Sequence, residues 1–485
     1  MKLSEVIRRA VSPDPQITGV TADSRKVQSG FLFAALPGTT VDGRQFAPKA
    51  VESGAAAVLA GGEAPGLSVP LVVSPDPRRA YALAAANFWG AQPQTCVAVT
   101  GTNGKTSVAN FCRQMFARAG RVSASMGTLG LTVTRPDGTN EQLTPAGLTT
   151  PDAADIAELL AKVAQMGVTH FAMEASSHGV DQRRLDGVKL TAAGFLNLTQ
   201  DHLDYHTTME AYRAAKLRLF ETLLPRGGTA VLNADSDAYP FFAAAAVCAG
   251  QTVVSVGEAG QGIRLIERAL LPEGQRLKLD VHGLACTVRL PLAGGFQASN
   301  ALVAAGLCMA AGLSVEEVMA GLETLQGAAG RLQRVGAGPR GGEAYVDYAH
   351  TPDGLETVLR ALRPHVSGKL IVVFGAGGDR DRGKRPIMGE IAARLADVAI
   401  VTDDNPRSED PAAIRAEVLA GAPSGGAREI GDRREAIRAG AAALGEGDIL
   451  VVAGKGHEQG QKVGDVVHPF DDVVETRAAL ELVHG

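Results

Sequence analysis

The chain has 485 residues, of which 45% are hydrophobic and 20% are charged, as in an ordinary globular protein of about three domains. A formal net charge of -5 and an aromatic content of 4% do not favour a nucleic acid as its partner. Its cysteines (Cys96, Cys112, Cys248, Cys286 and Cys308) are dispersed and form no C-x-x-C pair, which argues against a zinc site and a disulfide framework and fits a reducing compartment.

The first domain is expected to span residues 1–88, although its pattern does not identify an architecture. Residues 1–14 include Glu5, Arg8 and Arg9 and lack the apolar core of a secretory signal. We place the domain boundary in residues 89–95, where Gly, Pro and Gln precede an apolar strand.

A phosphate-binding loop is the strongest local signal. The apolar strand at residues 96–100 leads into a glycine-bearing turn, and an amphipathic helix follows. Backbone N–H groups at such a helix start bind anions, Lys105 can reach a terminal phosphate, and Thr106 can place its hydroxyl on Mg²⁺. The standard loop has a further glycine five residues before Gly104, where this chain has Val99. We therefore interpret the motif as a shorter variant, Gly-x-x-Gly-Lys-Thr, rather than as a turn with a chance lysine.

Further strands are expected at residues 168–173 and 192–198, with an amphipathic helix around residues 156–163. This alternation predicts a mostly parallel sheet covered by helices. Glu174 follows the first of these strands. A carboxylate at that end of a parallel strand lies in the ligand crevice and could hold Mg²⁺, whereas the other interpretation is a solvated strand-end glutamate.

Three residues of the central domain, which extends to a break at residues 327–330, leave their roles open. His202 follows a strand and is either a metal or phosphate ligand or a histidine at a helix start. Lys216 cannot be distinguished from an ordinary solvated lysine on a helix. Asn300 precedes the apolar residues 301–313, where an N-cap role is the stronger interpretation. That apolar run is too short to span a bilayer, so we expect a cytoplasmic protein without a membrane partner.

Strand and helix alternate again in residues 331–485, which predicts a second α/β domain. Arg331 lies at the domain break, where its charge could reach a ligand, and Asp347 ends a strand, a usual place for a ribose-binding acid. The expected strands are residues 344–348, 370–374, 398–402 and 449–453, and the expected helices are residues 353–362, 387–395, 412–419 and 434–444.

Polar, turn-rich loops follow three strands of this domain. The loop at residues 374–385 resembles a dinucleotide fingerprint, but Arg380 occupies the third glycine position, so we discount NAD and expect an anionic substrate. The other two loops are residues 402–407 and 453–458. Because the carboxyl ends of parallel strands meet at one edge of a sheet, the three loops together predict a binding site.

Taken together, these motifs resemble the Mur ligase family over nearly the whole chain. The short phosphate loop, residues 100–106, is the family's ATP signature. The other matching motifs are residues 173–179, 197–206, 347–353, 377–381, 404–407 and 454–458. Motifs of this length, in this order, make the resemblance specific.

The resemblance implies an α/β protein with a UDP-substrate-binding domain (1–88), a central P-loop ATPase domain with a parallel sheet (89–330) and a C-terminal Rossmann-like amino-acid-binding domain (331–485). It implies an ADP-forming ligase of peptidoglycan synthesis that requires Mg²⁺. The substrates would be ATP, UDP-N-acetylmuramoyl-L-alanyl-D-glutamate (a UDP-MurNAc-dipeptide) and meso-diaminopimelate, which would be joined through an acyl phosphate. We expect a monomer.

The resemblance also assigns roles to residues. ATP would contact Thr100, Gly101, Thr102, Asn103, Gly104, Lys105, Thr106, Asn300, Arg331 and Asp347. Mg²⁺ would be held by Thr106, Glu174, His202 and Lys216, the last as a carbamate. The catalytic residues would be Lys105, Glu174, His202 and Lys216. The UDP-substrate would contact Ser24, flanked by Asp23 and Arg25, and Thr39, Thr40, Thr149, Thr150, Ser176, Gln182 and Arg184. Diaminopimelate would contact Arg380, Asp404, Asn405, Pro406, Arg407, Gly454 and Glu458. Leu148 stands where the family commonly has asparagine, so no contact is assigned to it.

Two kinds of alternative remain. A sibling ligase that adds lysine, or a folylpolyglutamate synthetase, would share the chemistry, but residues 404–407 and the UDP-substrate motifs argue against both. A nucleotide-gated regulatory P-loop protein belongs to a different class and would bind or hydrolyse ATP without forming an amide.

Overall fold

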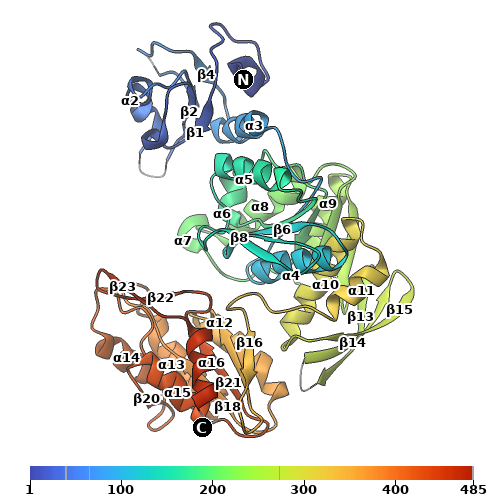
Figure 1. The fold of residues 1–485 in the computed structure, drawn as a ribbon, viewed down its shortest axis with the longest axis vertical. Coiled ribbons are helices and arrows are strands. Elements are labelled where there is room, and N and C mark those ends of the chain that lie inside the picture. The colour runs from blue at the N-terminus through green and yellow to red at the C-terminus, as the bar shows by residue number, and fades with distance from the viewer. Residues whose placement is uncertain (39–40, 65, 272–273, 483–485) are drawn as a thin grey trace. The chain divides into compact units, whose positions relative to one another are not determined.

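The computed structural model describes residues 1–38, 41–64, 66–271 and 274–482 (Figure 1). The chain forms two compact units. One comprises Met1–Leu265, Asp280–Leu284 and Asn300–Gly321, and the other comprises Ile266–Leu279, Ala285–Ser299 and Leu322–Gly485. Within the described ranges, no helix is long and apolar enough to cross a membrane.

The N-terminal part of the first unit is a small parallel sheet with strands in the order β1-β2-β3-β4. Helix α3 starts where the Asp76 side chain accepts a hydrogen bond from the Arg79 N–H, and it ends at Gly90 in the left-handed region. The elements are α1 (Leu3–Ile7), β1 (Gly19–Thr21), β2 (Phe31–Ala35), α2 (Ala47–Glu52), β3 (Ala57–Ala60), β4 (Leu71–Val73) and α3 (Pro77–Trp89).

A sheet of 11 strands follows, in the order β15-β14-β13-β12-β11-β10-β5-β9-β6-β7-β8. The neighbours of β5 are both parallel to it, which confirms the expected parallel sheet, whereas β6, β7 and β8 form antiparallel pairs. The strands are β5 (Thr95–Thr100), β6 (Ser123–Gly127), β7 (Gly130–Thr134), β8 (Asn140–Thr144), β9 (His170–Glu174), β10 (Ala192–Phe195), β11 (Thr229–Asn233), β12 (Thr252–Gly257), β13 (Ile263–Leu271), β14 (Gly274–Val281) and β15 (Leu284–Leu290).

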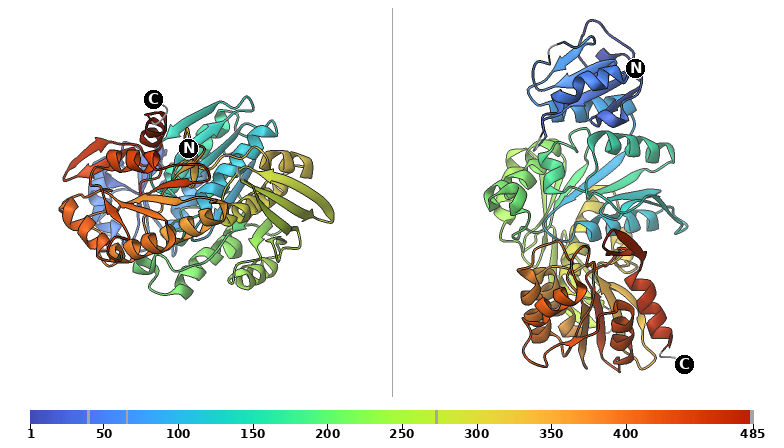
Figure 2. Two further views of the ribbon diagram at one scale, coloured as in Figure 1. Left: turned by 90° about the horizontal axis from the view of Figure 1, so that it is seen from below. Right: turned by 90° about the vertical axis from the view of Figure 1, so that its left-hand side faces the viewer.

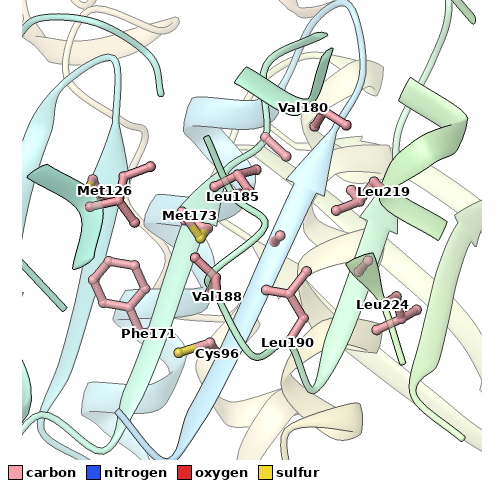
Figure 3. Close-up of a cluster of buried hydrophobic side chains, with 14 of the residues drawn as sticks. Cys96, Met126, Phe171, Met173, Val180, Leu185, Val188, Leu190, Leu219 and Leu224 are labelled. Carbon is pink, nitrogen blue, oxygen red and sulfur yellow. The ribbon is translucent and has the colours of Figure 1, made fainter. Parts of the chain in front are cut away.

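One face of this sheet buries a large apolar core, in which Cys96, Phe171 and Met173 from the strands meet Leu185 and Leu190 from the segment before β10 (Figure 3). The helices are α4 (Lys105–Arg118), α5 (Ala153–Gln165), α6 (Ser177–Asp181), α7 (Leu203–His206), α8 (Met209–Arg218), α9 (Tyr239–Cys248), α10 (Gly295–Ala310) and α11 (Val315–Leu322). Because α10 begins at Gly295, Asn300 lies inside the helix, and its interpretation as an N-cap is wrong.

The C-terminal sheet has the order β16-β17-β21-β18-β19-β20 and is parallel except for β16. Alternate strand residues point to opposite faces, so helices α12, α13 and α14 cover one face and α15 and α16 cover the other (Figure 2). The elements are β16 (Gln333–Ala337), β17 (Glu343–Asp347), α12 (Pro352–Leu362), β18 (Leu370–Phe374), α13 (Lys384–Leu395), β19 (Val398–Val401), α14 (Pro411–Leu419), β20 (Arg428–Glu429), α15 (Arg433–Ala442), β21 (Ile449–Ala453), β22 (Gly460–Val463), β23 (Val466–Pro469) and α16 (Asp472–Leu482). The predicted α/β domain is confirmed.

Candidate functional site

The phosphate loop lies between β5 and α4, as the sequence predicts. Gly104 has φ 90°, in the left-handed region, and a side chain there would collide with Asn300 Oδ1, so the position requires glycine. The Lys105 Nζ donates to the carbonyl oxygens of Gly101 and Thr102, both at 2.8 Å. The buried Thr106 is the second residue of α4. The ammonium group thus lies over the loop that would receive a phosphate.

Asn197, which the sequence did not single out, holds the middle of this loop. Its Oδ1 accepts hydrogen bonds from the N–H groups of Thr102, at 3.1 Å, and Asn103, at 2.9 Å. The Thr102 hydroxyl donates to the Thr199 carbonyl oxygen at 3.1 Å. Asn197 follows β10, which is hydrogen-bonded to β5, and this adjacency is the signal that could have identified it.

Lys216 is buried beside the same loop, so it is not a solvated lysine. Its Nζ donates to the Gly101 carbonyl oxygen at 2.8 Å and lies 4.4 Å from the centre of the Tyr212 ring. That carbonyl also accepts from Lys105, so two ammonium groups share one acceptor. Burial, reinforced by the charge of Lys105, lowers the pKa of Lys216 well below its usual value. The lowered pKa favours the neutral, nucleophilic form of the Lys216 amine.

Glu174 is the last residue of β9 and is only 2% exposed, so its interpretation as a solvated glutamate is wrong. Its carboxylate accepts from the Thr128 N–H at 2.8 Å and the Thr128 hydroxyl at 3.3 Å. Val99 of β5 pairs with Glu174, which places the carboxylate at the edge of the sheet that bears the phosphate loop. Thr128, in the turn after β6, carried no signal in the sequence.

His202 is the N-cap residue of helix α7, at a helix start as one of its two interpretations predicted, but among the described residues its side chain makes no capping hydrogen bond. Its Nε2 lies 3.4 Å from Asp201, and its ring centre is 4.9 Å from that of His178. Among the residues that the structure describes, no three His, Cys, Asp or Glu side chains converge as a metal site. The oxygen donors Thr106 and Glu174 suit Mg²⁺, and a carbamate on Lys216 would add another.

The residues assigned to the UDP-substrate beside Glu174 form one network. The Thr150 hydroxyl donates to the Glu174 carbonyl oxygen at 3.1 Å and accepts from the Ser176 N–H at 3.1 Å. Arg184 donates to the Thr150 carbonyl oxygen at 2.5 Å and to Gln182 Oε1 at 2.7 Å. The remaining member, Thr149, has its hydroxyl 3.0 Å from that of Thr128.

Ser24 lines a cavity of about 1030 Å³, together with Asp23, Arg25, Phe46 and Trp89. The cavity is large enough for a nucleotide-sized ligand. Thr39 and Thr40, which the resemblance also assigns to this substrate, lie outside the described residues. At Leu148, where the family commonly has asparagine, the apolar side chain is 68% exposed.

In the second unit, Asp347 ends β17 with a buried carboxylate. It accepts from the N–H groups of Leu332 at 2.5 Å and Ala349 at 2.8 Å. Burial raises the pKa of Asp347 to about 6, although the neighbouring Arg331 opposes the shift. The Arg331 guanidinium lies 4.7 Å from the centre of the Tyr348 ring.

The loops after β19 and β21 meet, as the sequence predicts. The Asn405 Nδ2 donates to Glu458 Oε2 at 2.9 Å, and the Lys455 Nζ donates to Asn405 Oδ1 at 3.0 Å and to Glu458 at 3.2 Å. The buried Asp404 faces Gly454, where a Cβ would lie 2.5 Å from Asp404 Oδ2. Lys455, which the sequence analysis did not assign, is fully buried and pairs with Glu458.

Arg407 is half-buried and has φ 54°, in the left-handed region. Its Nη1 donates to the Gly378 carbonyl oxygen at 2.6 Å, and the Gly378 N–H donates to the Asn405 carbonyl oxygen at 2.9 Å. The loop after β18 therefore packs on the loop that contains Arg407 and the buried Pro406. Arg380, in the same loop as Gly378, is exposed.

Comparison with known proteins gives matches along the whole chain. Three family models match: "Mur ligase family, catalytic domain" at residues 16–87, "Mur ligase middle domain" at residues 99–308, and "Mur ligase, glutamate ligase domain" at residues 330–456. The chain is 70% identical, over 99% of both chains, to the UDP-N-acetylmuramoyl-L-alanyl-D-glutamate--2,6-diaminopimelate ligase of Caulobacter vibrioides. It is 53% identical to the enzyme of that name from Mesorhizobium japonicum, over 98% of this chain and 97% of that one.

Solved structures are also similar. A structure of a UDP-N-acetylmuramoyl-L-alanyl-D-glutamate--2,6-diaminopimelate ligase has a TM-score of 0.77 and 35% identity, over 100% of this chain and 99% of that one. The MurF ligase of Thermotoga maritima in complex with ADP has a TM-score of 0.64 and 18% identity, over 96% of this chain and 98% of that one, which shows a shared fold.

Proposed function

The chain belongs to the Mur ligase family, and on that premise we propose that it joins meso-diaminopimelate to the D-glutamate of UDP-N-acetylmuramoyl-L-alanyl-D-glutamate, with ATP as co-substrate. The observation that carries the proposal is 70% identity, across 99% of the chain, to a relative of that name. The product would be a precursor of peptidoglycan, made in the cytoplasm by a monomer.

The phosphate loop suits activation of the glutamate carboxylate. A carboxylate is a poor electrophile, so ATP first transfers its γ-phosphoryl group to give an acyl phosphate and ADP. Lys105 lies over the loop and offsets negative charge that develops on the transferred group. Mg²⁺, held by Thr106 and Glu174, would supply further charge compensation. Attack by the amine then forms the amide and releases phosphate.

Lys216, as a carbamate, supplies a further magnesium ligand in this proposal. Carbamate formation requires a neutral amine, which adds to CO₂ and loses a proton, and the lowered pKa of buried Lys216 favours that form. The carbamate would convert two adjacent cations into an ion pair of Lys105 with an anionic oxygen ligand. We expect a carbon-13 carbamate signal after labelling with bicarbonate that is absent from Lys216→Met and retained in Lys105→Met. Its absence from the wild type would remove Lys216 from the metal site.

The amino-acid loops suit a zwitterionic group. Lys455 offsets the charge of Glu458, which leaves Asp404 and Arg407 as an acidic and a basic group on one loop. Diaminopimelate ends in an ammonium and a carboxylate at both ends, whereas the far end of lysine lacks the carboxylate. Arg407 has the planar geometry that binds a carboxylate with two hydrogen bonds.

The test is a complete ligation assay with purified protein, ATP, the UDP-MurNAc-dipeptide and meso-diaminopimelate, in which ADP release and product mass are measured together. Omission of either acceptor should stop amide formation, and lysine should replace diaminopimelate poorly. ADP release that is indifferent to both acceptors, without an amide product, would identify a regulatory nucleotide-binding protein instead.

A further inference from the structure

A fully buried ion pair lies behind the loops that would bind diaminopimelate. Arg433, the first residue of α15, and Asp472, the first residue of α16, have side chains that are 0% exposed. Two parallel hydrogen bonds join them, from Nε to Oδ1 at 2.8 Å and from Nη2 to Oδ2 at 2.7 Å. Removing two charges from water is costly, and replacing a buried ion pair with apolar residues of similar size is often neutral or stabilising. Stability alone therefore does not account for the Arg433–Asp472 pair.

The remaining hydrogen bonds of Arg433 reach both substrate loops. Its Nη2 donates to the carbonyl oxygen of Ala453, the residue before Gly454, at 3.0 Å. Its Nη1 donates to the carbonyl oxygen of Asp403, the residue before Asp404, at 3.4 Å. One guanidinium therefore fixes the backbone at the point where each loop leaves its strand.

Arg433 also lies close to the carboxylates of these loops. A Cβ on Gly454 would lie between Asp404 Oδ2, at 2.5 Å, and Arg433 Nη2, at 3.7 Å. Burial alone would lower the pKa of Arg433, but Asp472 foremost, and then Asp404 and Glu458, raise it. Asp472 accepts from one edge of the guanidinium, through Nε and Nη2, so the main ionic partner of Arg433 is Asp472 and not Asp404.

We propose that Arg433 is a positioning residue for the amino-acid site and that Asp472 keeps its guanidinium from pairing with Asp404. The Asp404 carboxylate then stays available for the ammonium of the incoming amino acid. This inference rests on the proposed function, since it assigns the amino acid to this pocket.

The first test is Asp472→Asn, which keeps the shape and removes the charge. The freed guanidinium should turn to Asp404 and compete with the substrate ammonium, so KM for meso-diaminopimelate should rise by about tenfold, the effect of one charge-assisted hydrogen bond. KM for ATP, KM for the UDP-MurNAc-dipeptide and kcat at saturating diaminopimelate should stay unchanged. An unchanged KM for diaminopimelate in folded Asp472→Asn overturns the proposal.

The chain offers a matched control in the next pair along the same helices. Arg434 and Glu475 are joined by two hydrogen bonds, both 2.7 Å, but the Arg434 side chain is 48% exposed. Glu475→Gln should leave KM for diaminopimelate at the wild-type value. An equal rise in Glu475→Gln would assign the effect to the helix pair and overturn the role of Asp472.

A second variant covers the case in which Asp472→Asn does not fold. Arg433→Met/Asp472→Leu replaces the pair with apolar side chains, a change that proteins often tolerate. Its thermal midpoint should stay close to that of the wild type while KM for diaminopimelate rises, because the loops lose their anchor. A folded double variant with wild-type KM overturns the proposal. Failure of wild-type protein to use diaminopimelate at all would instead refute the proposed function.

Discussion

Substitution of Gly104 by alanine should destabilise the fold and weaken ATP binding. Any residue with a Cβ costs about 1–2 kcal/mol in the left-handed region, which Gly104 occupies with φ 90°. The new methyl group would also collide with Asn300 Oδ1, on a side chain that is 4% exposed and has little room to move. Overpacking of this kind costs about 1–3 kcal/mol more, so the total is about 2–5 kcal/mol.

Gly120 provides the control just after α4, because it has φ 80° and, its chain neighbours aside, no atom of the described residues lies within 4 Å of an added Cβ. Gly120→Ala should therefore lower the free energy of unfolding only by the cost of a Cβ in the left-handed region, about 1–2 kcal/mol. Calorimetry should show ATP affinity falling at least about tenfold in Gly104→Ala and unchanged in Gly120→Ala. Equal losses of thermal stability in the two variants, with wild-type ATP affinity in both, would refute the contact-based reasoning.

Three further outcomes are expected. Lys105→Ala should abolish ligation and leave the thermal midpoint nearly unchanged, because charge compensation worth several kcal/mol is lost only during phosphoryl transfer; near-normal turnover would contradict this role. For Asp347, burial raises the pKa from 3.8 to about 6, so the folded state holds a proton that the unfolded state releases; between about pH 3 and pH 7 the wild type should lose about 3 kcal/mol of unfolding free energy relative to Asp347→Asn, read from urea midpoints, and a flat difference would exclude the shift. Arg407→Ala should lower kcat/KM for diaminopimelate by about ten- to a hundredfold, and equal use of lysine and diaminopimelate by the wild type would rule out the assignment.

The C-terminal domain was predictable from sequence because its strands are buried on both faces. Strands β18 and β21 are unbroken apolar runs flanked by turn residues, and both occur where the sequence placed them. Their order in space was not predictable, but parallel strands place all their carboxyl ends at one edge. That rule was enough to bring the loops that contain Asn405 and Glu458 together.

Other features were hidden for physical reasons. Strands β1 and β4 have three residues each, too few for a recognisable period, so the N-terminal sheet was not identified. Lys216 is buried against Gly101, which lies 115 residues away along the chain. No local sequence pattern predicts a contact between residues so far apart. Helix α10 was expected to begin with the apolar residues that follow Asn300, whereas it begins at Gly295, and Phe296 of its first turn packs on buried side chains.

The left-handed backbone of Arg407 restricts which side chains could replace it in the proposed amino-acid site. Its φ of 54° is held by a hydrogen bond from its N–H to the Lys462 carbonyl oxygen at 3.0 Å. Glycine, asparagine and aspartate tolerate that conformation, whereas valine, isoleucine and threonine are strained in it. A mutational path towards an apolar amino acid therefore cannot simply install a branched aliphatic side chain here. It would first need a loop of different length or shape, so in the proposed site the backbone conformation would limit specificity as much as the side chain does.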